Sequence, residues 1–190
     1  NKTEQRKKMI LRKKYWLYYV LTFLSGARRQ IFMVFAGFMM VEKFGYSVQE
    51  ISILYIGNYA VNIFLAPKIG NLITQVGEKN ILTFEYLGLV LIFSSYSFVE
   101  NKIIAAVLYV LDHMFFGMAM ALKTYFQKIA NPEDIASTAG ISFTINHIAA
   151  VIIPALFGFL WLKSPSLVFG IGAGMSFCSF LFSRMIKIEH

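Results

Sequence analysis

The chain has little cysteine, little proline and few acidic residues. Its single cysteine, Cys178, excludes an intrachain disulfide framework and a cysteine-based zinc site. No set of nucleophiles or metal ligands occurs at a spacing typical of a catalytic centre, so we expect a protein that is not an enzyme and that needs neither metal nor cofactor. Ten acidic residues stand against 18 basic ones, and no long polar extension is present to dock on other proteins.

Apolar residues are what the chain has in abundance. They make up 57% of the 190 residues, and 19 of them are phenylalanine, whereas soluble proteins are about 45–50% apolar. A membrane-spanning helix needs about 20 mostly apolar residues, and six stretches qualify. They run over Lys14–Val41, Val48–Ile69, Asn80–Val99, Lys102–Tyr125, Ser137–Leu162 and Ser166–Ile186. The sequence predicts an all-α polytopic membrane protein with six transmembrane helices in one bundle over residues 14–187, between a basic, linker-like segment (1–13) and a short tail (188–190).

The basic residues are distributed unevenly between the two ends of these helices. Thirteen fall on one side, namely Lys2, Arg6, Lys7, Lys8, Arg12, Lys13, Lys14, Lys68, Lys79, Lys123, Lys128, Arg184 and Lys187. Only three, Lys43, Lys102 and Lys163, fall on the other. Because loops rich in lysine and arginine stay in the cytoplasm, we expect both termini to be cytoplasmic. The protein is expected in a cell membrane, such as the bacterial inner membrane.

Charged residues interrupt two of the apolar stretches. Arg28 and Arg29 lie in the middle of the first stretch, and Asp112 and His113 lie in the middle of the fourth. A charge at bilayer depth costs about 2.5–3.5 kcal/mol on insertion scales and is tolerated where it faces a bundle interior or a water-filled cavity. We therefore interpret these four residues as part of a solute or proton pathway. Adjacent helical residues point about 100° apart, so we do not expect both arginines to face one partner.

Each of these residues has two interpretations. One arginine binds an anionic group of a substrate as a planar bidentate donor, or it interacts permanently with Asp112 or with a helix C-terminus. Asp112 is either a protonation switch, since burial and a nearby arginine act on its charge in opposite directions, or a permanent partner of Arg28 or Arg29. His113 belongs to the residue type that titrates near neutrality.

Polar residues on other helices are further candidates. Gln30 follows the arginines and is expected to share their polar face, and Asn146 and His147 lie on the fifth helix. Each contacts substrate or hydrogen-bonds a neighbouring helix, the usual role of polar groups between membrane helices. Asn58 and Asn62, four residues apart, share one face of the second helix, and we assign them the second role.

Two residues are expected to shape the bundle. Glu85 on the third helix is predicted to form an ion pair with Arg184, Lys79 or Lys123 and so to fix helix packing, with a role in transport as the alternative. Pro154 lies inside the fifth helix, where a proline removes a hydrogen bond and kinks the rod.

A glycine motif follows the second helix. Residues 70–80 read Gly-Asn-Leu-Ile-Thr-Gln-Val-Gly-Glu-Lys-Asn. This segment resembles the Gly-x-Leu-x-Asp-x-x-Gly-x-Lys/Arg loop of the major facilitator superfamily. Gly70, Leu72, Gly77 and Lys79 match, whereas Thr74 stands at the acidic position. We expect a short cytoplasmic loop over this segment, whose two glycines permit a tight turn and close helix approach.

The resemblance implies a fold and a function. The chain is similar to the carboxy-terminal six-helix half of such a transporter, in which the first and fourth helices line the central cavity. The second and fifth helices contact the other half, and the third and sixth face lipid. It implies secondary active transport of a small molecule by alternating access, with exchange for protons, as in an antiporter, as one option.

Six helices supply only one wall of such a cavity, so we expect a partner. The options are a second copy, a separate amino-terminal half, or the missing front of a longer chain, and the absence of an initiating Met favours the last two. A pair of copies would surround the cavity with four arginines and favour an anionic solute. Two alternatives stay open: a non-transporting accessory subunit of a membrane complex, and an intramembrane enzyme acting through Asp112.

Overall fold

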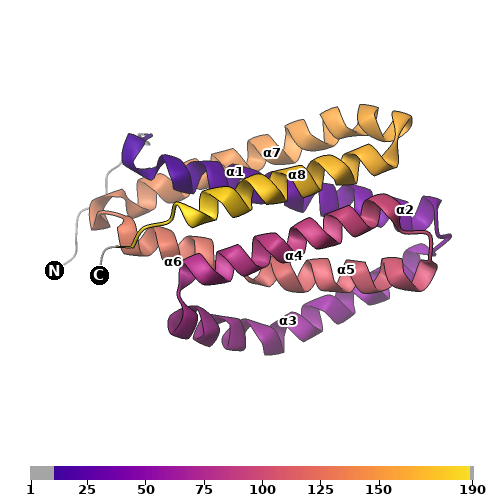
Figure 1. The fold of residues 1–190 in the computed structure, drawn as a ribbon, viewed down its shortest axis with the longest axis horizontal. Helices are drawn as coiled ribbons and strands as arrows, with labels where there is room; N and C mark the ends of the chain where they lie inside the picture. Colours follow the sequence, from indigo (N-terminus) through magenta and orange to yellow (C-terminus); the bar gives the residue numbers. More distant parts are fainter. Residues whose placement is uncertain (1–10, 189–190) are drawn as a thin grey trace.

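The structure, a computed structural model, describes residues 11–188 and arranges its helices along one long axis (Figure 1). The helices are α1 (Trp16–Gln30), the π-helix η2 (Ile31–Ala36), α2 (Gly37–Glu42), α3 (Val48–Val76), α4 (Glu78–Phe98), α5 (Lys102–Gly117), α6 (Met120–Ile129), α7 (Ile135–Lys163) and α8 (Pro165–Arg184). Two short 3-10 turns, η1 (Lys13–Tyr15) and η3 (Pro132–Asp134), precede α1 and α7.

Since α1, η2 and α2 are continuous and α5 leads into α6, the described chain forms six rods. The predicted all-α, six-helix architecture is confirmed. Most of the expected basic segment (1–10) and residues 189–190 of the expected tail lie outside the described residues.

Four of the rods are long and apolar enough to cross a membrane. They are Glu78–Phe98, Lys102–Ile129, Pro132–Lys163 and Pro165–Arg184. In the first rod the α-helix is divided by η2, and α3 carries several polar side chains along its length. By length and composition the described residues therefore supply four candidate spans, and the membrane crossing of α1–α2 and of α3 stays a prediction.

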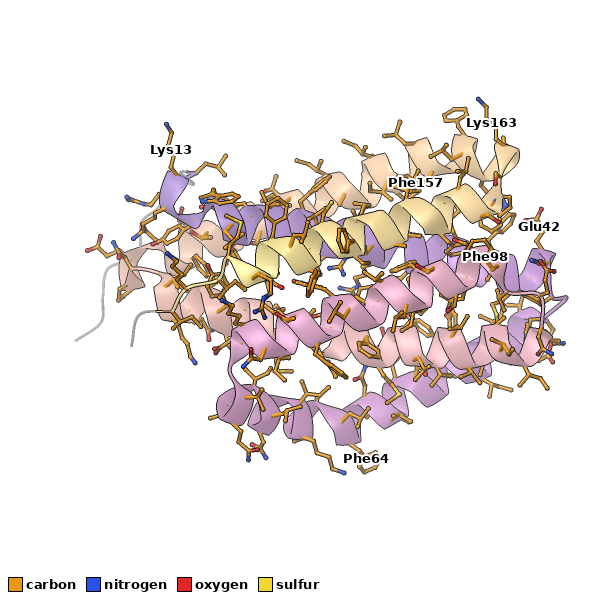
Figure 2. The ribbon with its side chains drawn as sticks, in the orientation of Figure 1. Lys13, Glu42, Phe64, Phe98, Phe157 and Lys163 are labelled. Carbon is orange, nitrogen blue, oxygen red and sulfur yellow. The ribbon has the colours of Figure 1, made fainter. Side chains whose placement is uncertain are left out.

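The six rods pack side by side. α4 lies along α8, α1 lies along α7 and α8, and α3 packs on α5 at the opposite edge of the bundle (Figure 1). The start of α1 and the end of α8 lie at the same end of the molecule, together with the α3–α4 turn. Lys13 marks this end and Lys163 the other, while Phe64 projects outward from α3 (Figure 2). Phe157 is buried, whereas Phe64 and Phe98 are exposed.

The α3–α4 turn differs from the predicted loop. Helix α3 runs through Gly70 to Val76, and Gly77 alone makes the turn, with a φ of 87° that favours glycine. Ile69 and Ile73, one helical turn apart, are both buried and hold the additional turns against the bundle. The prediction of a loop beginning at Gly70 is therefore wrong, and the prediction of a tight turn at Gly77 is confirmed.

The fourth rod is interrupted where the sequence predicts a continuous helix. Helix α5 ends at Gly117, and a short turn leads into α6. In this turn the Met118 N–H donates to the Phe115 carbonyl at 2.9 Å, and the Ala119 N–H donates to the Phe116 carbonyl at 3.1 Å. These are the tighter bonds of a 3-10 turn. The side chains of α6 therefore point in other directions than they would on an uninterrupted continuation of α5.

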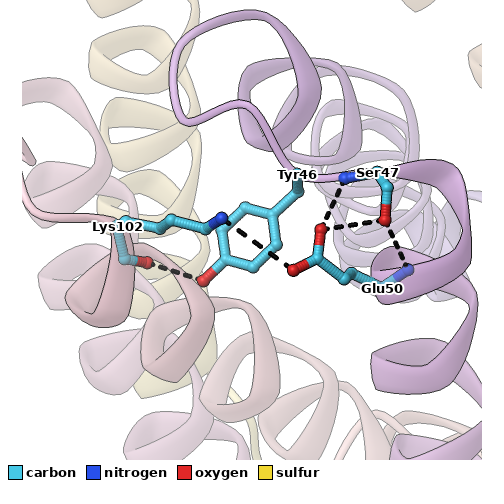
Figure 3. Close-up of polar contacts among 4 residues, drawn as sticks. All are labelled: Tyr46, Ser47, Glu50 and Lys102. Carbon is cyan, nitrogen blue, oxygen red and sulfur yellow. Dashed lines mark hydrogen bonds and ion pairs between the residues drawn. The ribbon is translucent and has the colours of Figure 1, made fainter.

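A polar cluster joins the α2–α3 connection to the α4–α5 connection, at the end of the bundle opposite the α3–α4 turn (Figure 3). The Tyr46 hydroxyl donates to the Lys102 carbonyl at 3.0 Å, and the Lys102 ammonium lies 3.9 Å from the Glu50 carboxylate. Ser47 and Glu50 form a reciprocal capping box that starts α3. Burial and the nearby Glu50 carboxylate raise the pKa of Tyr46.

Candidate functional site

A cavity of about 310 Å³ lies between α1, η2, α3, α5, α6 and α7. Its volume is at the lower end of the range for small-molecule sites, about 300–1,000 Å³. Three basic side chains, Arg29, His113 and Lys123, line it, and none of the described aspartates and glutamates does. The first and fourth rods thus contribute to the wall, together with α3 and α7.

The two adjacent arginines have opposite surroundings, as the rotation between neighbouring helical residues predicts. Arg29 is exposed and lines the cavity. Arg28 is fully buried: its Nε donates to the Leu24 carbonyl at 3.1 Å, and its guanidinium lies 4.6 Å from the centre of the Tyr86 ring. Its two terminal nitrogens have no hydrogen-bond partner among the described residues.

Two buried carboxyls accompany Arg28. Glu85 and Asp112 are both 0% exposed, and each interacts electrostatically with Arg28. None of their four carboxyl oxygens has a hydrogen-bond partner within residues 11–188. The predicted ion pair of Glu85 with Arg184, Lys79 or Lys123 is wrong, because Glu85 lies deep in the bundle beside Arg28. The cluster formed by Arg28, Glu85 and Asp112 lies behind the cavity wall and does not line it.

His113 stands among aromatic rings of the cavity. Its ring centre is 5.2 Å from that of Tyr59, 6.0 Å from that of Tyr55 and 6.1 Å from that of Phe32. Arg29 interacts electrostatically with both Tyr55 and His113. Arg29 and the ring cluster therefore line the same cavity.

Helix α7 supplies an amide and a hydroxyl to the cavity. Asn146 donates from Nδ2 to the Ser142 carbonyl at 3.0 Å, and the Ser142 hydroxyl lies 3.0 Å from that of Tyr18. A Cβ at position 26 would lie 2.6 Å from Asn146 Oδ1, so Gly26 is the residue that lets α1 approach this amide. All four residues line the cavity.

Comparison with known protein families decides what kind of membrane protein this is. The model of the Major Facilitator Superfamily matches residues 18–189. The chain belongs to the major facilitator superfamily. Members of this superfamily are secondary transporters of small molecules and not enzymes, so the facilitator chain is a multi-pass membrane protein of the transport class. No curated protein matches the chain.

Other predicted site residues of this facilitator lie away from the cavity or at its edge. Asn62 lines it, whereas Asn58 is buried with its Nδ2 unpaired among the described residues. Gln30 does not line it, and neither does His147, whose ring is 3.9 Å from that of Phe143.

Residues predicted to shape the facilitator bundle are placed elsewhere. Pro154 lies within α7, which continues through it as one helix. Lys79 lies in the first turn of α4 beside Gly77. Its neighbour Glu78 is buried and forms an ion pair with Lys128 at 2.8 Å.

Sequence reasoning missed the aromatic part of the facilitator's cavity. Tyr55, Tyr59 and Asn62 lie at positions i, i+4 and i+7 of α3 and share one face, and all three line the cavity. This spacing was a usable signal, hidden by the abundance of aromatic residues elsewhere. Lys123 was assigned to the end of the helix by its charge, and the break before α6 brings it into the wall.

Proposed function

We propose that this chain is one six-helix half of a transporter that moves a small molecule across a cell membrane by alternating access. The observation that carries the proposal is the cavity with Arg29 in its wall. A guanidinium facing hydrocarbon costs about 2.5–3.5 kcal/mol, so a second bundle and water between the two halves are needed opposite Arg29. The partner is a second copy, a separate half, or another part of a longer chain.

Three features support the arrangement of this half. The resemblance of residues 70–80 and the basic start favour the carboxy-terminal half. The first rod begins and the last rod ends at the same end of the bundle, which is the end richer in basic residues, so we propose that this end is cytoplasmic. A bacterial inner membrane fits this orientation.

We further propose that transport is coupled to proton exchange through the buried cluster. Arg28 carries one positive charge, while Glu85 and Asp112 together carry two negative charges when ionised. An uncompensated charge in an apolar interior is costly, so a proton on either carboxyl makes the cluster neutral. An Asp112→Asn variant is expected to lose the dependence of solute flux on a pH gradient, measured in proteoliposomes that contain the whole assembly.

Cysteine accessibility tests alternating access without knowledge of the solute. In a Cys178→Ser background, Asn62→Cys places one thiol in the cavity wall. We expect a membrane-impermeant maleimide added to the medium to label this thiol in right-side-out vesicles, through the extracellular face. We expect it to label the thiol in inverted vesicles as well, through the cytoplasmic face. The Cys178→Ser protein alone is the control. Labelling from one side only, or from neither, would contradict the proposal and favour a non-transporting accessory subunit.

A further inference from the structure

We infer that the solute is an organic anion that carries a planar ring, with its acidic group at Arg29 and its ring among the aromatic side chains around His113. This inference rests on the proposed transport function, because it names what occupies the cavity during transport.

The charges around the cavity select the sign of the ligand. Arg29 and Lys123 line the cavity, and within residues 11–188 neither has an ion-pair partner. Glu85 and Asp112 are buried in the cluster with Arg28 and do not line the cavity. A cationic solute would meet two like charges and no carboxylate there. An anion supplies the missing counter-charge.

The geometry of Arg29 favours a carboxylate or phosphate group. A guanidinium presents its N–H groups as a planar fork that matches two oxygens of such a group. Lys123 adds a second, more flexible donor in the same cavity. Asn146 and Asn62 supply amides that discriminate polar substituents by hydrogen bonding.

The aromatic side chains favour a ring on the same molecule. The ring centres of Tyr55 and Tyr59 are 4.8 Å apart at a steep angle, and those of Phe32 and Phe116 are 5.6 Å apart. All four line the cavity, and three of them contact the His113 ring. Aromatic pairs prefer edge-to-face and offset geometries, so a planar ligand ring meets both faces and edges here. The volume of about 310 Å³ suits a solute of one or two rings.

Equilibrium binding of radiolabelled 2-naphthoate to membrane vesicles that contain the whole protein tests the inference. We expect saturable binding, and we expect the neutral isostere 2-naphthamide to compete at least about tenfold more weakly. The Arg29→Gln variant is expected to lose about 10- to 100-fold in affinity, the usual effect of removing a charge-assisted hydrogen bond. Arg29→Lys keeps the charge but lacks the planar fork of N–H groups, so its affinity is expected to lie between those of the original protein and of Arg29→Gln. Because Arg29 is exposed, these variants should insert and fold normally.

Two controls separate charge and ring. Lys163→Gln removes one positive charge far from the cavity and is expected to leave binding unchanged. Acetate is expected to compete much more weakly than naphthoate. Equal competition by naphthamide, or unchanged binding in Arg29→Gln, would overturn the anion assignment. Equal competition by acetate would overturn the ring assignment.

Failure of the anion inference and failure of the transport proposal give different experimental results. If naphthoate binds through Arg29 but the thiol at position 62 is labelled from one side only, the anion site stands and transport fails. If that thiol is labelled from both sides while naphthamide or 2-naphthylmethylamine competes as well as naphthoate, transport stands and the anionic class is overturned.

Discussion

Arg28 carries a positive charge into the bundle interior, where Glu85 and Asp112 are its charged neighbours. Removal of a buried charge leaves its partners uncompensated, at a cost of about 3–5 kcal/mol. We therefore expect Arg28→Gln to lower the thermal unfolding midpoint of the purified protein strongly. Arg29→Gln, one residue away but exposed to the cavity, should leave the midpoint nearly unchanged. Equal midpoints for the two variants would contradict the divergent positions of the arginines.

Gly77 and Gly70 allow a second test at single residues. Gly77 has φ and ψ of 87° and 152°, a region that is essentially restricted to glycine, so Gly77→Ala should cost about 1–3 kcal/mol. Gly70 lies inside α3 with open space where a Cβ would stand, so Gly70→Ala should be neutral or slightly stabilising. Chemical denaturation of both variants checks this, and destabilisation by Gly70→Ala alone would contradict the helix that runs to Val76.

For single residues, the sequence predicted which side chains are charged better than it predicted which way those side chains point. The charges of Arg28, Arg29 and Asp112 were evident, and the rotation between neighbouring helical residues predicted that the arginines would diverge. Which arginine faces the cavity depends on how α1 is turned toward α4 and α7, and a single amphipathic pattern does not fix that turn in a helix surrounded by apolar residues.

Gly88 permits the close approach of helices α4 and α5, because it has no side chain. A Cβ added there would lie 2.1 Å from the Phe115 ring, which itself packs on Phe84 at 5.6 Å between ring centres. Overpacking of this kind typically costs about 1–3 kcal/mol, so Gly88→Ala should destabilise the bundle by that amount in thermal unfolding. Gly158→Ala is the matched control, because open space surrounds that position in α7. A similar effect of both variants would contradict the packing.

Element boundaries were predicted well where polar residues end a helix and poorly where they do not. The Ser47 capping box and the Asn101 cap coincide with the predicted starts of α3 and α5. The break after Gly117 and the π-helix η2 lie in apolar stretches without a proline. Hydrophobic periodicity does not report such local changes of the backbone.

For the whole molecule, the orientation of the bundle is open to direct measurement. In a Cys178→Ser background, we expect Ser164→Cys, in the α7–α8 connection, to react with an impermeant maleimide from outside the cell. Gln75→Cys, near the α3–α4 turn, should react only after the membrane is opened. The two positions lie at opposite ends of the rods (Figure 1). The reverse pattern would contradict the proposed cytoplasmic termini.

The number of rods and their order could be read from composition, because a segment of about 20 apolar residues has few other folds in a membrane. The cavity could not be predicted in full. It depends on several rods at once and on a break in one of them, and the apolar pattern of a single helix records neither.

The π-helix η2 lies between two firm attachments of the first rod. On one side of it, in α2, Phe38 meets Trp161 edge-on at 5.5 Å between ring centres, and Trp161 donates from Nε1 to Glu42 at 2.9 Å. On the other side, the Tyr15 hydroxyl donates to Asp134 at 3.0 Å. A π turn has a wider and less regular hydrogen-bond ladder than an α turn. We expect torsion on this rod to be taken up within the six residues that follow Gln30, which would rotate the helix next to Arg29 while both of its ends remain tethered.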